Sequence, residues 1–172
     1  MEKSAVIIGG GLGGLFTGAI LSKEGVKVTV IEKNPTVGGG LQSFIRFGET
    51  FDTGMHVIGG MQEGGNIRRI CEYLGIFDKV HVMDVDPDVI DTLYFAEDKK
   101  FYKITQGKDG FVNALSESFP DQKDNLRSYV DAVYSIVDEL DMFYLRPSQD
   151  FIFVHSEDFM MPADGFIAKY IS

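Results

Sequence analysis

One stretch near the start of the chain decides the fold: Ser4-Ala5-Val6-Ile7-Ile8-Gly9-Gly10-Gly11-Leu12-Gly13-Gly14. Its first five residues form a short apolar run, which is typical of a buried strand. The glycines then match Gly-x-Gly-x-x-Gly between a strand and a helix, the context in which this pattern binds a dinucleotide. Residues 12–24 predict a helix that stops at Gly25, and residues 26–31 predict a second strand. The order predicts a βαβ unit with parallel strands and a right-handed crossover.

Each glycine of the turn has its own physical reason in such a unit. Gly9 permits the tight turn, Gly11 lets the backbone approach a pyrophosphate, and Gly14 lets the helix pack closely on the strand. The helix begins with Leu12 and Gly13, whose amides, with the helix dipole, favour the charge of a phosphate. The alternative is a Rossmann-like turn that binds no ligand.

Glu32 follows the second predicted strand, about twenty residues after the glycines. Its carboxylate is placed to accept hydrogen bonds from the hydroxyls of an adenosine ribose. An acid at this position repels a 2′-phosphate, so the sequence predicts FAD or NAD rather than NADP.

Glycine and charge are distributed unevenly along the 172 residues. Residues 1–65 hold 16 of the 20 glycines, and only four remain in residues 66–172. The chain has 16 Lys and Arg against 26 Asp and Glu, a net charge of −10, and nearly all of the excess lies after residue 65. This acidity argues against nonspecific nucleic-acid binding. Cys71 is the single cysteine, so no intrachain disulfide can form and a reducing compartment is expected.

Residues 5–21 are uncharged but predict neither a signal peptide nor a membrane span. The stretch is short for a span and contains six glycines. We therefore expect a cytoplasmic protein.

The remaining patterns predict a loop at 38–40, a hairpin over 43–51, a helix over 66–74, antiparallel strands at 89–95 and 99–104, and helices over 110–119, 125–144 and 163–171.

Two later motifs indicate which class of nucleotide-binding protein the chain resembles. Residues 32–39, Glu32-Lys33-Asn34-Pro35-Thr36-Val37-Gly38-Gly39, resemble the flavoprotein pattern in which a Gly-Gly pair follows the ribose acid. The run Phe51-Asp52-Thr53-Gly54-Met55-His56, with Gly59 after it, resembles the carotenoid desaturase and retinol saturase family. The resemblance is strong over residues 5–65 and looser to about residue 145.

The resemblance implies a two-domain FAD enzyme of the amine-oxidase-like superfamily, which moves a hydride between flavin and a polyene or another lipophilic substrate. Residues 1–65 would form the first segment of a Rossmann-like α/β FAD-binding domain, and residues 66–172 would form linker helices and an incomplete α+β substrate domain. The cofactor-binding positions that it implies are Gly9, Gly11, Leu12, Gly13, Gly14, Glu32, Lys33, Gly39, Gly40, Asp52, Gly54, Met55 and His56.

Gly40 departs from the superfamily pattern, because many members have Arg directly after the Gly-Gly pair. The departure favours the retinol saturase branch. It also means that a cationic contact to the cofactor is missing, or that Lys33 supplies it in another geometry.

His56 is the candidate catalytic side chain, as a hydrogen-bond partner of flavin or substrate or as a proton relay. The alternative is a histidine that only fixes its loop. Asp52 is either a general acid or a cap of its turn. No spacing of His and Cys predicts a metal site.

The expected partners are a lipophilic small molecule, NAD(P)H as a candidate electron donor, and a membrane surface as a candidate peripheral contact. Two alternatives to this enzyme stay open: a truncated nucleotide-binding domain without activity, and an amine-oxidase-like enzyme with another substrate.

Overall fold

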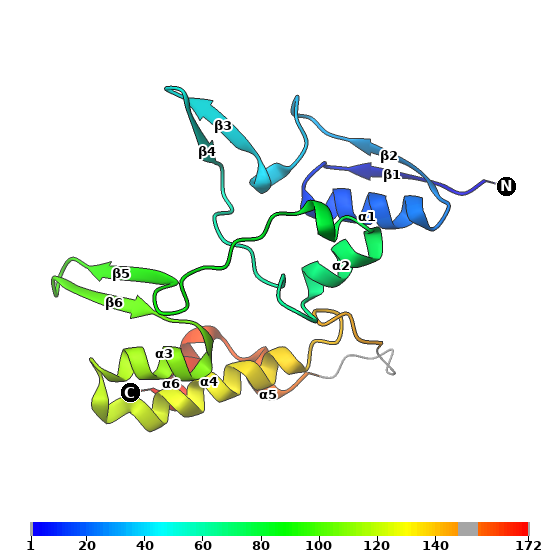
Figure 1. Cartoon of the computed structure of the whole chain (residues 1–172). Coiled ribbons are helices and arrows are strands. Elements are labelled where there is room, and N and C mark those ends of the chain that lie inside the picture. Colours follow the sequence, from blue (N-terminus) through cyan, green and yellow to red (C-terminus); the bar gives the residue numbers. More distant parts are fainter. Residues whose placement is uncertain (1, 148–154, 172) are drawn as a thin grey trace. The chain divides into compact units, whose positions relative to one another are not determined.

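The computed structural model describes residues 2–147 and 155–171, which form two compact units, Met1–Val82 and Met83–Ser172 (Figure 1). We describe each unit by itself. The expected division at residue 65 into a cofactor segment and a substrate domain stays a prediction.

The first unit is built on a βαβ motif, as the sequence predicts. Strand β1 (Ser4–Ile8) leads through the glycine turn into helix α1 (Leu12–Lys23), and strand β2 (Lys27–Ile31) follows. The strands pair in parallel, from Ser4 opposite Lys27 to Ile8 opposite Ile31. Gly25 has a φ of +82°, a left-handed conformation that suits glycine and ends the helix.

Helix α1 covers one face of this two-stranded sheet. Gly18 is buried against that face, where an added Cβ would lie 3.3 Å from Ile7 Cδ1 and 3.4 Å from Val30 Cγ2. The opposite face carries Val6 and Ile8, which are 64% and 89% exposed. The sheet is therefore packed on one side only.

Beyond β2, the chain forms a short 3-10 turn η1 (Gly39–Leu41) and an antiparallel hairpin of β3 (Ser43–Arg46) and β4 (Glu49–Asp52). The hairpin is predicted correctly. The predicted loop at residues 38–40 overlaps turn η1, which includes Gly39 and Gly40. Helix α2 (Asn66–Leu74) and turn η2 (Phe77–Lys79) complete the unit.

Helix α2 is held to α1 by polar contacts near the carboxyl ends of both helices. The Tyr73 hydroxyl donates to the Glu24 carboxylate, and the Lys23 ammonium donates to the Tyr73 carbonyl. Cys71 of α2 is buried, and this burial raises the pKa of its thiol.

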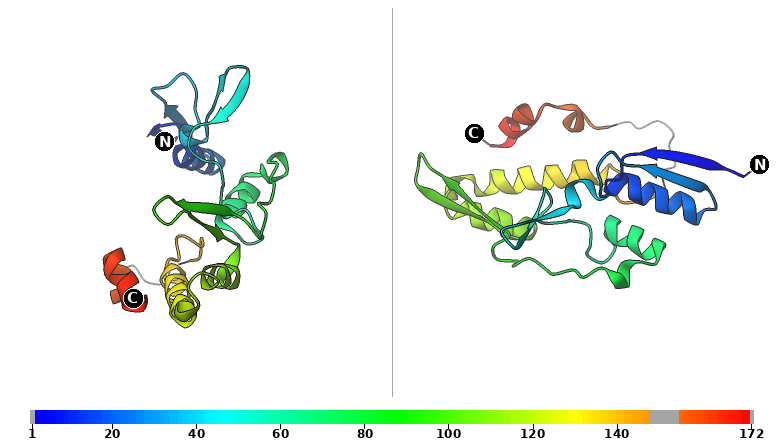
Figure 2. Two further views of the ribbon diagram at one scale, coloured as in Figure 1. Left: turned by 90° about the vertical axis from the view of Figure 1, so that its left-hand side faces the viewer. Right: turned by 90° about the horizontal axis from the view of Figure 1, so that it is seen from above.

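The second unit combines a hairpin with helices (Figures 1 and 2). Its elements are β5 (Asp91–Phe95), β6 (Lys100–Ile104), α3 (Gly107–Ser116), η3 (Pro120–Gln122), α4 (Lys123–Asp138), α5 (Glu157–Met160) and α6 (Ala163–Tyr170). The two strands pair antiparallel, as predicted. A small core of Val112, Leu126 and Val130 joins α3 to α4.

Helix α4 ends earlier than its apolar stripe predicts. The pattern runs to Tyr144, but the helix stops at Asp138. The Arg146 guanidinium turns back, donates to the carbonyl of Asp138 and pairs with the Asp141 carboxylate at 3.0 Å. A cation that satisfies an orphan carbonyl closes a helix end. Helix α3 also differs from its prediction, because it spans Gly107–Ser116 instead of residues 110–119.

Across residues 2–147 and 155–171, no helix combines the length and the apolar character needed to cross a bilayer.

Candidate nucleotide-binding site

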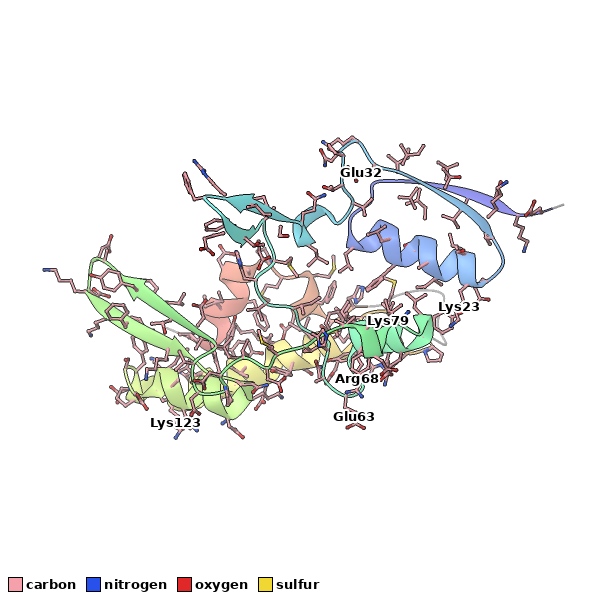
Figure 3. All side chains as sticks on the ribbon, turned by 45° about the horizontal axis from the view of Figure 1, so that its top comes forward. Lys23, Glu32, Glu63, Arg68, Lys79 and Lys123 are labelled. Carbon is pink, nitrogen blue, oxygen red and sulfur yellow. The ribbon has the colours of Figure 1, made fainter. Side chains whose placement is uncertain are left out.

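The carboxylate of Glu32 joins the ends of the two parallel strands. The backbone N–H of Gly10 donates to Glu32 Oε2 at 2.7 Å, and the N–H of Asn34 donates to Oε1 at 2.8 Å. These two bonds, that of Asn34 foremost, hold the pKa of Glu32 below its ordinary value. The side chain (labelled in Figure 3) is therefore a fixed anion at neutral pH, beside the glycine turn.

The glycine turn brings α1 as close to β1 as backbone atoms allow. Gly9 has a φ of +103°, and an added Cβ at Gly14 would lie only 2.1 Å from the Gly9 carbonyl oxygen. Only glycine fits at position 14 without movement of the helix. Gly11 is the N-cap of α1, and within the described residues no side chain caps this helix start. The first amides of α1 are thus left for another acceptor.

A second glycine segment lies against the first. The N–H of Gly38 donates to the Gly10 carbonyl at 2.7 Å, and Gly38 forms a parallel bridge with Gly11. Gly39 has a φ of +59°, and an added Cβ there would lie 3.1 Å from Gly11 Cα. The close approach of the two backbones and the positive φ together favour glycine on the second segment.

A third segment is tied to the second by hydrogen bonds. The N–H of Met55 donates to the Gly40 carbonyl at 3.1 Å. Thr53 donates to the Gln42 carbonyl through its N–H at 3.0 Å and through its hydroxyl at 2.9 Å. Gly54 faces the Gly40 carbonyl oxygen, which would be 3.6 Å from an added Cβ. The three segments therefore form one continuous cradle of backbone beside the start of α1.

Most of the sequence-predicted cofactor positions meet in this cradle, and three side chains stand apart from it. His56 is exposed, and no hydrogen bond to its side chain occurs among the described residues. Lys33 is exposed and lowers the pKa of Glu32 only as a lesser contributor. Asp52 is the last residue of β4, opposite Ser43. The roles of all these residues in binding stay predictions.

Gln42 is a contributor that the sequence reasoning missed. Its side-chain amide donates to the Thr36 carbonyl at 2.7 Å, while its own carbonyl receives both bonds from Thr53. It thereby links the second segment to the third. No local pattern around Gln42 indicates such contacts, because their partners lie six and eleven residues away.

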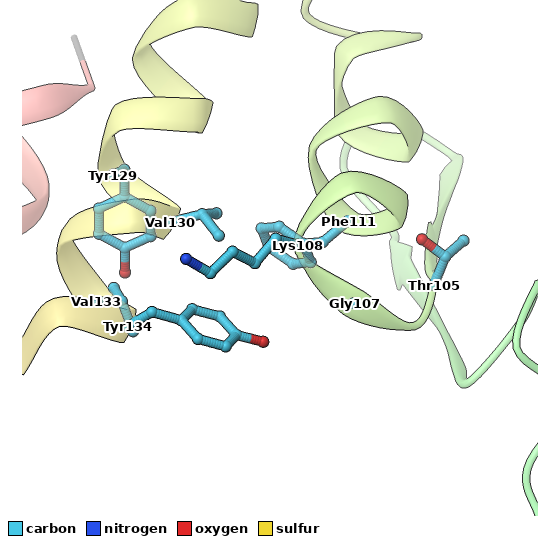
Figure 4. A pocket seen from close by; sticks show the side chains of 8 residues that line it. All are labelled: Thr105, Gly107, Lys108, Phe111, Tyr129, Val130, Val133 and Tyr134. Carbon is cyan, nitrogen blue, oxygen red and sulfur yellow. The ribbon is translucent and has the colours of Figure 1, made fainter. Parts of the chain in front are cut away.

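The second unit contains a separate pocket of about 320 Å³ between α3 and α4 (Figure 4). Phe111, Tyr129 and Val133 provide apolar walls, and the Lys108 ammonium lies 4.4 Å from the centre of the Tyr134 ring. Lys108 also pairs with Asp131 at 3.0 Å. The volume is at the lower end for small-molecule sites, which run from about 300 to 1,000 Å³. The pocket shares no residue with the predicted cofactor positions.

The βαβ motif, the glycine cradle and the ionised acid after β2 together define a Rossmann-like nucleotide-binding segment. Comparison with known proteins agrees: residues 7–74 match the family described as NAD(P)-binding Rossmann-like domain.

Curated relatives then define the resemblance more closely. The chain is 28% identical over 170 residues to prolycopene isomerase 1, chloroplastic, of an Oncidium hybrid cultivar. The match covers 98% of this chain and 28% of that protein. The chain is 35% identical over 134 residues to all-trans-retinol 13,14-reductase of Homo sapiens. This match covers 77% of this chain and 22% of that protein. The chain thus spans about a quarter of the length of these relatives. The predicted resemblance to the carotenoid desaturase and retinol saturase family is confirmed by these two relatives, one of which is named as a reductase.

Proposed function

We propose that this chain is a segment of an FAD-dependent oxidoreductase that acts on a double bond of a lipophilic isoprenoid or polyene. One observation carries the proposal: three glycine-containing segments converge at the uncapped start of α1, beside an ionised acid at the end of β2. The names of the relatives, a retinol reductase and a prolycopene isomerase, support the substrate class.

The residues present fit the adenosine diphosphate part of FAD. A Cβ at Gly39 would lie 3.1 Å from Gly11 Cα, so a side chain is disfavoured where the second segment meets the first, and Gly14 lets α1 pack closely on β1. Gly9 and Gly11 would hold the pyrophosphate with the first amides of α1, and Glu32 would accept hydrogen bonds from the ribose hydroxyls. When bound, the flavin would supply the hydride chemistry.

The protein's own contribution would be orientation and charge. The ionised Glu32 disfavours a 2′-phosphate, which argues for FAD or NAD over NADP in this site. The close approach of the 38–40 segment to the glycine turn supports FAD, in line with the flavoprotein pattern of these residues. His56 is proposed as a residue near the flavin ring, and NAD(P)H as the electron donor.

The first test is the visible spectrum of the purified 172-residue chain. Flavin absorption bands at near-stoichiometric intensity, or saturable uptake of added FAD, are the expected result. A colourless protein that takes up no FAD would contradict the proposal and favour a nucleotide-binding segment without a competent flavin site. Parallel titrations with NAD and NADP compare the dinucleotides on one protein.

A substitution then tests the ribose acid. Glu32→Ala should weaken FAD binding by about tenfold or more, because charge-assisted hydrogen bonds are lost. Glu97→Ala removes an exposed acid from the turn between β5 and β6 and is the matched control. Circular dichroism of both variants checks that the fold is kept. Unchanged FAD affinity in a folded Glu32→Ala protein would refute the ribose assignment.

Reduction of bound flavin by NADH, with retinol or phytoene as acceptor, tests the substrate class. Reduction by an amine instead would identify the other candidate, an amine-oxidase-like enzyme.

A further inference from the structure

The second glycine segment, residues 38–40, has no side chain of its own with which to hold its shape. Gly38 has a φ of +126° and Gly39 a φ of +59°. Glycine has the widest choice of backbone conformations, so three in a row form a flexible stretch unless other residues fix it. The side chains that fix this stretch therefore shape part of the cradle.

The side chain of Gln42 runs back along the segment. Its amide donates to the Thr36 carbonyl at 2.7 Å, and its Cγ would lie 3.1 Å from a Cβ added at Gly38. Gln42 is half-buried, although both of its neighbours in the chain are exposed. The bond ties residue 36 to residue 42 and so closes a ring that contains all three glycines.

Thr53 fixes the same stretch from the third segment. Its hydroxyl lies 2.9 Å from the carbonyl oxygen of Gln42 and 3.3 Å from that of Gly40. Its N–H also donates to the Gln42 carbonyl, at 3.0 Å. A hydroxyl has one proton to donate, so the nearer carbonyl, that of Gln42, is its main acceptor. One residue thus accepts the bonds from the third segment and makes the bond to Thr36.

The ring matters because of what the glycines inside it contact. The N–H of Gly38 donates to the Gly10 carbonyl at 2.7 Å, and Gly38 forms a parallel bridge with Gly11. These contacts close the cradle only while residues 38–40 keep one conformation. The bonds from the two side chains end on carbonyls within this stretch or beside it, so they act on the cradle through the backbone that they hold.

We propose that Gln42 and Thr53 are positioning residues for the cofactor: together they hold residues 38–40 against the glycine turn and thereby set the affinity for FAD. The inference rests on the proposed function, since it assigns a part in FAD binding, but the hold on the segment can be measured without FAD. If the segment were loose, part of the binding free energy would go into shaping it.

The first test separates the Thr53 hydroxyl from the rest of its side chain. Thr53→Val keeps the shape and removes the hydroxyl, and we expect it to weaken FAD binding by about fivefold, the effect of one net hydrogen bond. Thr53→Ser keeps the hydroxyl and should bind FAD as the wild type does. A serine variant as weak as the valine variant would show that the hydroxyl has no such role.

The second test removes the amide of Gln42. Gln42→Met keeps the length of the side chain and loses the donor to Thr36, so FAD affinity should again fall by about fivefold. Gln62→Met is the matched control, because Gln62 is an exposed glutamine of the same unit. It should bind FAD as the wild type does. Far-UV circular dichroism checks that each variant keeps its fold.

The double variant tests whether the two side chains act together. Independent effects would multiply, to a loss of about 25-fold in Gln42→Met/Thr53→Val. Because both side chains hold one stretch of backbone, losing either frees it, and the double variant should lose much less than this product. A full multiplication would contradict joint action.

Hydrogen exchange of the free protein completes the experiment. Peptides that cover residues 36–42 should exchange faster in Gln42→Met and Thr53→Val than in wild type or Thr53→Ser, while peptides of α1 keep their protection. Unchanged exchange over residues 36–42, or FAD affinity equal to wild type in both variants, would overturn the inference. A wild-type chain that binds no FAD would instead refute the proposed function, and with it any role of these residues in binding; faster exchange in the variants would still show that they hold the segment.

Discussion

Gly14 offers the sharpest test of how α1 is placed on β1. In Gly14→Ala, the new methyl group would lie 2.1 Å from the Gly9 carbonyl oxygen, well inside the 3.4 Å at which ordinary contact begins. The helix must therefore move by about 1.3 Å, the difference between these two distances, because the obstacle is backbone and not a flexible side chain. Overpacking of this kind costs about 1–3 kcal/mol.

Gly13→Ala is the matched control, one residue earlier in the same helix. A Cβ at Gly13 meets nothing within 4 Å, so this variant should gain up to about 1 kcal/mol from the better helix propensity of Ala. Because both variants share that gain, the difference between them isolates the steric term. We expect Gly14→Ala to be less stable than Gly13→Ala by about 1–3 kcal/mol.

The assay is urea unfolding followed by far-UV circular dichroism, with hydrogen exchange on peptides of α1. The exchange data assign the change to the first unit, which matters because the chain has two compact units. Equal stabilisation by both alanines would show that α1 does not pack on the turn as described, and with it the argument for glycine at position 14 would fail.

Three further predictions concern other parts of the chain. The pKa of Glu32 is lowered in the folded state, so its contribution to stability is present above the unfolded pKa of the carboxyl and is lost as the pH falls through the folded pKa. The difference in urea midpoint between wild type and Glu32→Gln should therefore shrink as the pH falls from 7 to 3, and a constant difference would contradict the ionised state. Gly40→Arg should fold normally, because a Cβ there lies 4.0 Å from Met55 Cγ, and should bind FAD more tightly in a fluorescence titration; weaker binding would mean that backbone exposure at this position matters more than a cation. Leu126→Ala, at a position only 6% exposed, should destabilise the second unit by about 2–5 kcal/mol in hydrogen exchange and leave α1 protection unchanged, whereas a loss in both units would show that they unfold together.

The parts of the fold that follow from sequence are those fixed by local chemistry. The apolar run of β1, the glycines after it and the stop at Gly25 all act within a few residues, and the βαβ motif agrees with them. At the end of α4, the Asp138 carbonyl accepts a hydrogen bond from Arg146, eight residues further along the chain, while the apolar stripe continues past the last helical residue. The spacing of apolar residues indicates which side of a helix is buried, but it does not indicate which later side chain will bond to the last carbonyls of the helix.

In the candidate site, too, some features follow from local sequence, and others depend on contacts between residues far apart in the chain. Glu32 and the glycines are recognisable because backbone conformation and charge restrict the residue types at those positions. The contact between Gly38 and Gly11, and the bonds from Thr53 to Gln42, join segments that no spacing rule connects. The cradle therefore becomes visible only when the three segments are seen together in space.

The two backbone bonds to Glu32 also have an entropic consequence. A free glutamate side chain has many rotamers, and a ligand that needs one of them must offset the freedom lost on binding. Here Gly10, 22 residues away, and Asn34 already hold the carboxylate when the chain folds. Folding has therefore ordered this acceptor in advance, and a ribose that reached it would meet a preorganised partner.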